Sequence, residues 1–292
     1  MSQRVWLNGQ PCPTDDAAVS IYDGGFLHGA GLFETMRAYN RAPFRYQPHI
    51  DRLLASASKL ALPITAENLP SIDQARDLIT GNGLTDARLR LTVTTGSLRP
   101  GADDAPPALT VLLTAVPFSP YPAEFYAKGV TALISEHRQT RHDPLCGHKS
   151  TAFFARLLAL REAQRRGCLE AVWFTTENHL AEGCISNVFI VKDGVLKTPP
   201  TDTPVLPGIT RAVVLDLARR ADHEVAETAL TIDDLLDADE VFVTNSGFEL
   251  VPVVHIERRP IGNEKPGPLT TELLDRYRAE VIADTGSSAP TP

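Results

Sequence analysis

The 292-residue sequence has few cysteines and no long uncharged apolar run. Its four cysteines show no CxxC pair and no regular spacing, which argues against a disulfide framework and is typical of reduced thiols in a cytosolic enzyme. No apolar run approaches membrane-spanning length, and the first residues lack the apolar segment of a secretory signal. We therefore expect a cytoplasmic protein that does not enter a membrane.

Positive charge is scarce as well. The net charge is -8 with a pI near 5.5, and no Lys/Arg block is dense enough to follow a phosphate backbone, so nucleic acid is not expected as a partner. Cys146 and His148 could be metal ligands, but no second pair at ligand spacing completes a site, and we expect no metal. The 43% of hydrophobic and 22% of charged residues are typical of a globular chain long enough for two domains.

Lysine is rare, and Lys149 stands apart from the other five lysines. Those five lie beside runs rich in Gly, Pro or Asp, or on the polar face of a helix; they are Lys59, Lys128, Lys192, Lys197 and Lys265. Lys149 directly precedes an apolar stretch with helical spacing. Desolvation lowers the pKa of an amine, and the neutral form attacks carbonyls, so Lys149 is a candidate Schiff-base lysine. The alternative is a lysine whose stem merely covers apolar surface.

The spacing of apolar residues predicts short strands and helices in two regions. In the first, strands are expected at 5–8, 19–22, 88–95 and 108–116, with a helix from Pro48 through Leu60. The polar loop 96–104 is a natural substrate-facing lid. In the second, strands are expected at 130–135, 171–175, 188–191 and 241–244, and a helix at 149–166 ends before Gly167.

These elements predict an α/β (α+β) fold with two domains. Three prolines in residues 117–122 exclude a helix interior or a central strand. We therefore expect an N-terminal α/β domain at 1–116, a linker at 117–129, a C-terminal domain at 130–284 and a disordered tail at 285–292. No internal repeat is visible.

Four further segments have the residue types that a phosphorylated, aldehyde-bearing pyridine cofactor requires. Gly208 and Thr210 precede a helix whose free N–H groups could bind an anion, although an ordinary helix cap is the simpler interpretation. Glu182 lies between strands and could pair with a protonated ring nitrogen, or could be a solvated turn residue. Arg52 near a helix start could reach a phosphate. The segment 244–247 (TNSG) follows an apolar strand and could add hydroxyls and an N–H group.

In their order and spacing these segments resemble the class IV aminotransferases, the fold-type IV pyridoxal-phosphate enzymes. The resemblance runs from about residue 5 to residue 256. It is carried by residues 26–37 (FLHGAGLFETMR), 49–53 (HIDRL), 149–150 (KS), 182–183 (EG) with 186–187 (SN), 206–211 (LPGITR) and 252–253 (PV). The family implies two α/β domains with the cofactor between them, in a homodimer.

The resemblance also implies roles for single residues. Lys149 would form the Schiff base with pyridoxal 5'-phosphate and move the proton between substrate carbon and cofactor, while Glu182 would hold the pyridine nitrogen. The other expected cofactor-binding residues are Arg52, Asn187, Gly208, Ile209, Thr210 and Ser246. The expected substrate-binding residues are Phe33, Thr35, Arg37, Arg90, Arg99 and Gly247. Each of the three arginines could clamp a carboxylate, or could be a surface ion-pair partner.

The signals for the subclass conflict. In the first motif, branched-chain transaminases typically have Phe-Glu-Gly-x-Arg. This chain has Thr35 at the Gly position, which resembles many 4-amino-4-deoxychorismate lyases. Asn245 also resembles the lyases, while Glu249 ahead of Pro-Val resembles the transaminases. After the catalytic lysine many members have an Asn and often a Tyr, whereas this chain has Ala152, Phe153 and Phe154, and the run 149–154 is nearer to D-amino-acid transaminases.

We therefore predict an aminotransferase that exchanges an amino group between an amino acid or amine and a 2-oxo acid. The alternative is 4-amino-4-deoxychorismate lyase, which eliminates pyruvate to give 4-aminobenzoate. A third possibility is a catalytically silent relative that binds or stores the cofactor. Retention of Lys149, Glu182 and Arg52 together argues against it.

Overall fold

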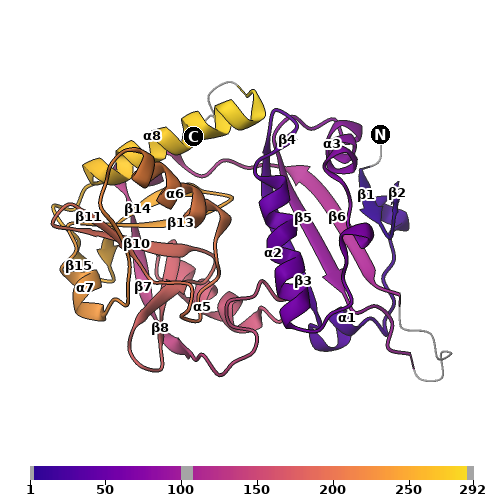
Figure 1. The fold of residues 1–292 in the computed structure, drawn as a ribbon, viewed down its shortest axis with the longest axis horizontal. Helices are drawn as coiled ribbons and strands as arrows, with labels where there is room; N and C mark the ends of the chain where they lie inside the picture. The colour runs from indigo at the N-terminus through magenta and orange to yellow at the C-terminus, as the bar shows by residue number, and fades with distance from the viewer. Residues whose placement is uncertain (1–2, 100–107, 288–292) are drawn as a thin grey trace. The chain divides into compact units, whose positions relative to one another are not determined.

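The computed structural model describes residues 3–99 and 108–287, and the chain forms two compact units (Figure 1). The first unit comprises Met1–Ser119, His148–Phe153 and Val281–Pro290. The second comprises Pro120–Gly147, Phe154–Glu280 and Thr291–Pro292. The first boundary falls inside the proline-rich stretch 117–122, and the segment that carries Lys149 belongs to the first unit although its neighbours in sequence belong to the second.

The first unit is built on a six-stranded antiparallel sheet with the order β2-β1-β6-β5-β3-β4. The strands are β1 (Arg4–Leu7), β2 (Gln10–Pro13), β3 (Gly31–Tyr39), β4 (Ala42–Pro43), β5 (Ala87–Thr94) and β6 (Thr110–Pro117). Helices α2 (Tyr46–Lys59) and α3 (Ile72–Gly81) contribute to its apolar core, and α2 runs along the sheet (Figure 1). In β5, buried Leu89, Leu91 and Val93 alternate with more exposed residues, as expected for a sheet covered on one face.

The second unit contains a nine-stranded mixed sheet with the order β12-β11-β10-β13-β14-β7-β8-β9, and β15 pairs with β14. Its strands are β7 (Val130–Gln139), β8 (Glu170–Thr175), β9 (Leu180–Gly183), β10 (Asn187–Lys192), β11 (Val195–Thr198), β12 (Val225–Glu227), β13 (Glu240–Asn245), β14 (Glu249–Ile256) and β15 (Arg259–Pro260). Because β9 pairs with both β8 and β10, six of these strands close into a ring. Ring closure removes the exposed strand edges and encloses an apolar core.

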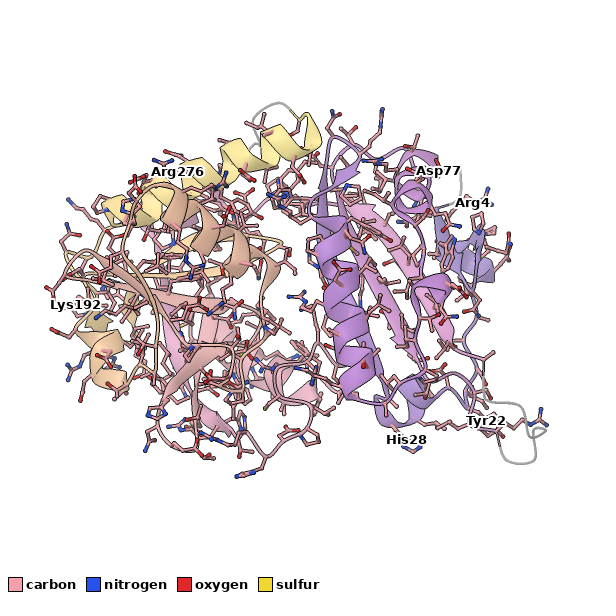
Figure 2. All side chains as sticks on the ribbon, in the orientation of Figure 1. Arg4, Tyr22, His28, Asp77, Lys192 and Arg276 are labelled. Carbon is pink, nitrogen blue, oxygen red and sulfur yellow. The ribbon has the colours of Figure 1, made fainter. Side chains whose placement is uncertain are left out.

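Helices and short turns complete the two units. They are η1 (Thr14–Asp16), α1 (Gly24–His28), η2 (Ala66–Asn68), α4 (Ala123–Lys128), α5 (Phe154–Arg165), α6 (Ile209–Arg220), α7 (Ile232–Leu236) and α8 (Pro268–Thr285). Charged side chains on outer faces, such as Asp77 on α3 and Arg276 on α8, are exposed and point away from the ribbon (Figure 2). No helix within the described residues is long and apolar enough to cross a bilayer.

The predicted mixture of helices and strands is confirmed, but several boundaries are wrong. Residues 19–22 form no strand: Ile21 is 68% exposed, and Asp23 caps the short helix α1 instead. The helix predicted at 149–166 begins only at Phe154, because the preceding residues pair with β3. Strand β3 begins inside the 26–37 motif, extends beyond it to Tyr39, and was not predicted as a strand.

Two predicted loops also differ from expectation. The segment 117–129, expected to be a linker, contains α4, and its Phe125 and Tyr126 pack against the core of the second unit. At the other end α8 continues to Thr285, within the expected tail. Residues 100–104 of the expected lid and residues 288–292 of the expected tail lie outside the described residues.

Candidate active site

Lys149 lies on an extended segment beside the start of β3. Its carbonyl oxygen accepts a hydrogen bond from the N–H of Phe33 at 2.8 Å. Two residues later the N–H of Thr151 donates to the carbonyl oxygen of Gly31 at 2.9 Å, and the Thr151 hydroxyl donates to the carbonyl oxygen of Gly29. These bonds fix the backbone of the lysine on a strand edge, so its side chain projects from a rigid base.

The side chain of Lys149 lies over the ring of Phe33. Its Nζ is 4.5 Å from the ring centroid, and the guanidinium carbon of Arg90 is 3.9 Å from the same centroid. Phe153 meets this ring edge-on, with the centroids 5.5 Å apart. Cations at these distances are attracted to an aromatic ring. Phe33 therefore brings together the predicted catalytic amine and one predicted substrate-binding arginine.

The register of β3 and β5 adds a second predicted residue to this group. Thr35 is directly opposite Arg90, and Arg37 is opposite Arg88, so the four side chains lie on one face of the sheet. Burial lowers the pKa of Arg90, and the nearby positive charge of Arg88 lowers it further. An anion such as a substrate carboxylate would relieve this like-charge repulsion.

Two other predicted arginines have different surroundings. The guanidinium of Arg37 is stacked on the rings of Tyr39, 4.1 Å from its centroid, and of Phe118, at 3.7 Å. Arg37 is only 5% exposed, so packing already occupies much of its surface. Arg99 is exposed and is the last described residue before the gap at 100–107. The structure therefore groups Arg90, and not Arg99, with Phe33.

Arg52 lies in a buried ionic cluster with Glu34 and His49. Its Nε donates to Glu34 Oε1 at 2.8 Å, and one terminal nitrogen donates to Oε2, where His49 Nδ1 also lies 2.7 Å away. Burial alone would raise the pKa of Glu34, but Arg52 and His49 lower it to about 2. The bidentate contact fixes the plane of the Arg52 guanidinium.

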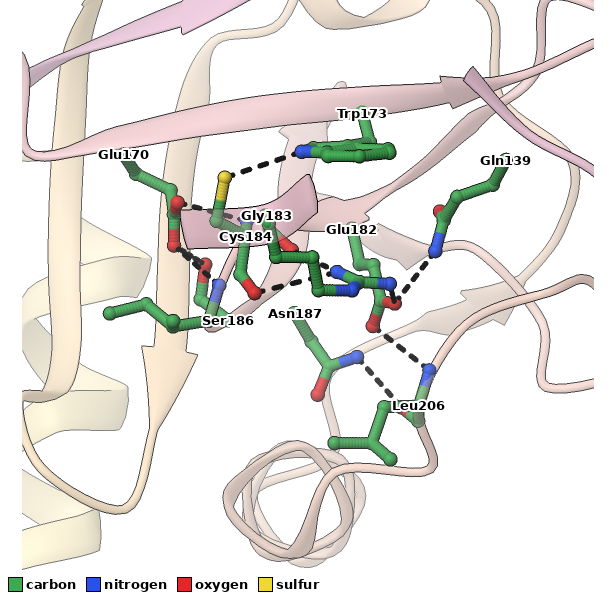
Figure 3. A network of polar contacts seen from close by, with 11 residues as sticks. Gln139, Glu170, Trp173, Glu182, Gly183, Cys184, Ser186, Asn187 and Leu206 are labelled. Atoms are coloured by element: carbon green, nitrogen blue, oxygen red, sulfur yellow. Dashed lines mark hydrogen bonds and ion pairs between the residues drawn. The ribbon is translucent and has the colours of Figure 1, made fainter. Parts of the chain in front are cut away.

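In the second unit, Glu182 and Asn187 are opposite each other at the closing pair of the strand ring. Figure 3 shows the contacts of this carboxylate. Oε1 of Glu182 accepts from Gln139 Nε2 at 3.0 Å and from the guanidinium of Arg156, and Oε2 accepts from the N–H of Leu206 at 2.9 Å. A carboxylate has about four acceptor positions, so among the described residues one position of Oε2 remains open.

The start of α6 lies close to this carboxylate through Leu206. The amide of Asn187 donates to the carbonyl oxygen of Leu206 at 2.9 Å, and Gly208, two residues later, is the N-cap of α6 without a side-chain cap. A Cβ at Gly208 would lie 1.9 Å from Oδ1 of Asn187, so only glycine fits there without displacing Asn187. The first N–H groups of the helix and the buried Thr210 thus form an uncapped N-terminus suited to an anion.

The turn after β13 carries Ser246 and Gly247. Asn245 accepts from the N–H groups of Gly247 and Phe248, at 2.7 and 2.9 Å, and its amide donates to the carbonyl oxygen of Ile185 at 3.1 Å. This side chain therefore joins two turns at one edge of the sheet.

Thr244, opposite Asn187 in the register of β10 and β13, has a buried hydroxyl with no partner among the described residues. Such a group requires an acceptor or donor from a ligand or water.

Three residues of this region were missed by the sequence analysis as site residues: Gln139, Arg156 and Glu170. Glu170 is fully buried and accepts from the N–H groups of Ala171 and Cys184, each at 2.9 Å, as well as from the Ser186 hydroxyl at 2.7 Å. An acid at the start of an apolar strand is a signal that could have identified Glu170. Nothing in the helical pattern of α5 distinguishes Arg156, because its role depends on a strand 26 residues away.

These features identify the family of the chain. The sequence pattern of the class IV aminotransferases, described as "Amino-transferase class IV", matches residues 31–256. The chain belongs to this family and is therefore a pyridoxal-phosphate-dependent enzyme of fold type IV.

Individual relatives extend the likeness over almost the whole chain. A putative branched-chain-amino-acid aminotransferase of Methanocaldococcus jannaschii is 38% identical over 280 residues, covering 94% of this chain and 95% of the relative. A D-alanine aminotransferase of Listeria monocytogenes is 34% identical over 288 residues, covering 97% and 98%. The crystal structure of the branched-chain aminotransferase of Escherichia coli superposes with a TM-score of 0.87 at 31% identity, covering 99% of this chain and 96% of that one.

The residues of each unit fit the chemistry of pyridoxal phosphate. In the second unit, the open position on Glu182 suits a protonated ring nitrogen. The uncapped α6 terminus and the unpartnered Thr244 hydroxyl suit the phosphate. In the first unit, taken by itself, the amine of Lys149 and the guanidinium of Arg52 have the chemistry that suits a carbonyl and a phosphate.

Proposed function

We propose that the chain transfers the amino group of an amino acid to a 2-oxo acid, with Lys149 as the catalytic amine. The observation that carries this proposal is the hydrogen bond from the N–H of Leu206 to the buried carboxylate of Glu182. Leu206 lies two residues before Gly208, the N-cap of the uncapped helix α6, so the carboxylate lies near this helix N-terminus. This pairing of an acceptor for a ring N–H with an anion site matches the two charged ends of one cofactor. When bound, pyridoxal phosphate supplies a carbonyl that condenses with amines and a ring that withdraws electrons.

Lys149 has two tasks in this proposal. Its Nζ would be the nucleophile that holds the cofactor through its carbonyl, and the same amine, once freed, would be the base that takes up and returns the proton of the substrate α-carbon. The rigid strand edge and the Phe33 ring hold the amine in place for both tasks. A four-carbon stem gives Nζ the reach to move between the two carbons.

The proposed residues bind the two charged ends of the cofactor, the protonated ring nitrogen and the phosphate, with groups of opposite charge. Glu182, fixed by three hydrogen-bond donors, accepts from the ring nitrogen. The phosphate is bound by the N–H groups of Ile209 and Thr210 and by the hydroxyls of Thr210 and Ser246. Arg52 adds a positive charge, and Glu34 orients its guanidinium. Asn187 holds the loop that leads into α6.

The substrate carboxylate is assigned to Arg90 with Thr35 beside it, and Phe33 and Gly247 border the substrate. The support is the register that pairs Thr35 with Arg90 and the stacking of Arg90 on Phe33. Arg37 contributes positive charge from the same sheet face. Arg99 stays a weaker proposal, since no contact within the described residues joins it to this group.

The lyase is the second candidate, favoured by Thr35 in the first motif. Asn245, the other lyase-like residue, has a structural use here, because it holds its own turn and the turn at Ile185. Its presence therefore discriminates less between the two reactions than the sequence suggests. Two relatives with 38% and 34% identity are aminotransferases, which favours the first candidate.

One experiment tests the catalytic amine and a second tests the reaction. Borohydride reduction of the purified enzyme, followed by peptide mass mapping, should place a pyridoxyl group on Lys149; a modified residue elsewhere would defeat the assignment.

In the second experiment, D-alanine, L-glutamate, L-leucine and an R-configured aryl amine are added singly to the enzyme. A transaminase releases one oxo acid per site and turns over only when a 2-oxo acid is also present. Repeated release of pyruvate and 4-aminobenzoate from aminodeoxychorismate, with poor reaction of every donor, would establish the lyase instead.

A further inference from the structure

Arg156 contacts three consecutive residues at the end of β9. One terminal nitrogen donates to Oε1 of Glu182, and the other donates to the carbonyl oxygens of Gly183, at 3.0 Å, and Cys184, at 3.4 Å (Figure 3). The guanidinium also lies 5.3 Å from the ring centroid of Trp173. Because a guanidinium is planar, these contacts fix both the backbone of the turn and the orientation of the carboxylate.

The Arg156–Glu182 pair is largely buried. The two side chains are 20% and 4% exposed. Burial lowers the pKa of Arg156, but the charge of Glu182 and its hydrogen bond raise it above the ordinary value. Removing one member of such a pair leaves the other charge buried without compensation.

The opposite side of the same turn is held by the buried side chain of Glu170. Glu170 accepts from the N–H groups of Cys184, at 2.9 Å, and Ile185, at 3.2 Å. Arg156 thus binds carbonyl groups of the turn and Glu170 binds its N–H groups, and Cys184 is held by both. Glu170 bonds to the backbone of the turn, whereas Arg156 bonds both to this backbone and to the Glu182 carboxylate.

We propose that Arg156 is a positioning residue for the ring nitrogen of the cofactor: it supplies the buried countercharge of Glu182 and holds its carboxylate in one orientation, with the open acceptor position on Oε2. This inference rests on the proposed function, in which Glu182 binds that nitrogen. Oε1 accepts from both Arg156 and Gln139, so a ring N–H is directed to Oε2, which accepts only from Leu206 among the described residues. Without Arg156, the carboxylate would be held by Gln139 and Leu206 alone and would lose its buried countercharge.

The test compares pyridoxal phosphate with its carba analogue, in which C–H replaces the ring nitrogen. Dissociation constants of both are measured for the full-length enzyme after its cofactor has been removed. The wild type should prefer pyridoxal phosphate, and Arg156→Met should reduce this preference about tenfold or more, the size expected from a disrupted charge-assisted hydrogen bond. Arg156→Gln, which keeps donors for the turn without the charge, should show the same loss if Arg156→Met does not fold. Arg156→Lys should retain most of the preference.

A matched control exists in the same unit. Arg278 pairs with Glu249 at 3.0 Å, with side-chain exposures of 20% and 2%, and its guanidinium lies 5.0 Å from the Tyr126 ring centroid. Arg278→Met should lower stability but leave the preference unchanged. If Arg156→Met or Arg156→Gln weakens both ligands equally, Arg156 only fixes the turn and the inference is overturned.

Glu182→Gln separates this inference from the proposed function. If Glu182→Gln loses the preference for pyridoxal phosphate but Arg156→Met and Arg156→Gln keep it, the positioning role of Arg156 is rejected and the proposed role of Glu182 stands. An unchanged preference in Glu182→Gln would show that Glu182 does not bind the ring nitrogen, and the assignment of Glu182 in the proposed function would fall with it.

Discussion

Two fully buried carboxylates, Glu34 and Glu170, are stabilised in different ways. Glu34 is paired with the cation Arg52 and with His49, so its pKa falls to about 2 although burial alone would raise it. Among the described residues, Glu170 accepts hydrogen bonds only from backbone N–H groups and the Ser186 hydroxyl, and burial raises its pKa in spite of these bonds. A nearby charge offsets desolvation more fully than neutral donors do.

The pKa of Glu34 predicts how the stability of the enzyme depends on pH. A carboxyl group with a lowered folded-state pKa contributes stability above its unfolded pKa, near 4.5, and loses it as the pH falls toward about 2. We expect the free energy of unfolding to fall by about 3 kcal/mol over this window from Glu34 alone. When the free energy of unfolding is measured with urea at successive pH values, it should depend less steeply on pH below 4.5 in Glu34→Gln than in the wild type.

Glu67 provides the control, since it is an exposed carboxylate on η2. Glu67→Gln should unfold with the pH dependence of the wild type. Equal slopes for the wild type and Glu34→Gln below pH 4.5 would contradict a lowered pKa for Glu34.

At the scale of single elements, the start of α8 is stabilised by a residue from another part of the chain. Glu240 at the start of β13 accepts from the N–H groups of Leu269 and Thr270, at 3.0 and 2.8 Å, and from the Thr270 hydroxyl at 2.6 Å. A Cβ on Gly267 would lie 1.9 Å from the Glu240 carboxyl carbon, so glycine permits this approach. A carboxylate at a helix N-terminus also interacts favourably with the helix dipole.

We therefore predict that Glu240→Ala destabilises the protein by about 2 kcal/mol or more, because two buried N–H groups and a hydroxyl lose their acceptor. The midpoint of thermal or urea unfolding measures the loss. Glu124→Ala removes an exposed carboxylate that is paired with Lys128 on α4, and it should change stability by less than about 0.5 kcal/mol. A loss of similar size in both variants would argue against the capping role.

For the whole molecule, the first unit exposes a group of large apolar side chains around α1. Phe26 is 74% exposed, Ile21 68%, Leu27 45% and Tyr22 41%. Leu98 belongs to the same group, because its N–H donates to the carbonyl oxygen of Tyr22. An exposed apolar group of this kind marks a protein–protein interface, and we propose that it is covered by a second copy of the chain.

The enzyme should therefore have twice the mass of the 31.7-kDa chain in light scattering. Phe26→Asp should shift it toward monomer, since burying a charge in an apolar interface is unfavourable. Ile232→Asp, at an apolar residue of the second unit that is 39% exposed, should leave the mass unchanged. A monomeric wild type, or a Phe26→Asp variant that dimerises normally, would reject this interface.

Much of this protein could be predicted from the sequence because the signals were local. The apolar runs at 171–175, 188–191 and 241–244 correspond to strands β8, β10 and β13, since a buried strand is recognised by its own residues. The motifs around Lys149, Glu182 and Gly208 indicated the family and its cofactor, since each motif serves the same chemistry wherever it occurs. Roles of individual residues toward cofactor and substrate stay predictions.

Contacts between distant segments were decided only by the tertiary structure. The apolar spacing after Lys149 predicted a helix from that residue, but hydrogen bonds to Gly31 and Phe33 hold it as a strand. Residues 19–22 have strand-like composition but end at the Asp23 cap of α1. Arg156 shows no pattern of its own that leads to the Glu182 turn, because its hydrogen-bond partners there lie at least 26 residues away in sequence. The position of Glu170 at the start of an apolar strand indicates a buried acid, but not its partners 14 to 16 residues away. Local periodicity records which face of an element is buried, whereas the partner of a buried charge is determined only when the chain has folded.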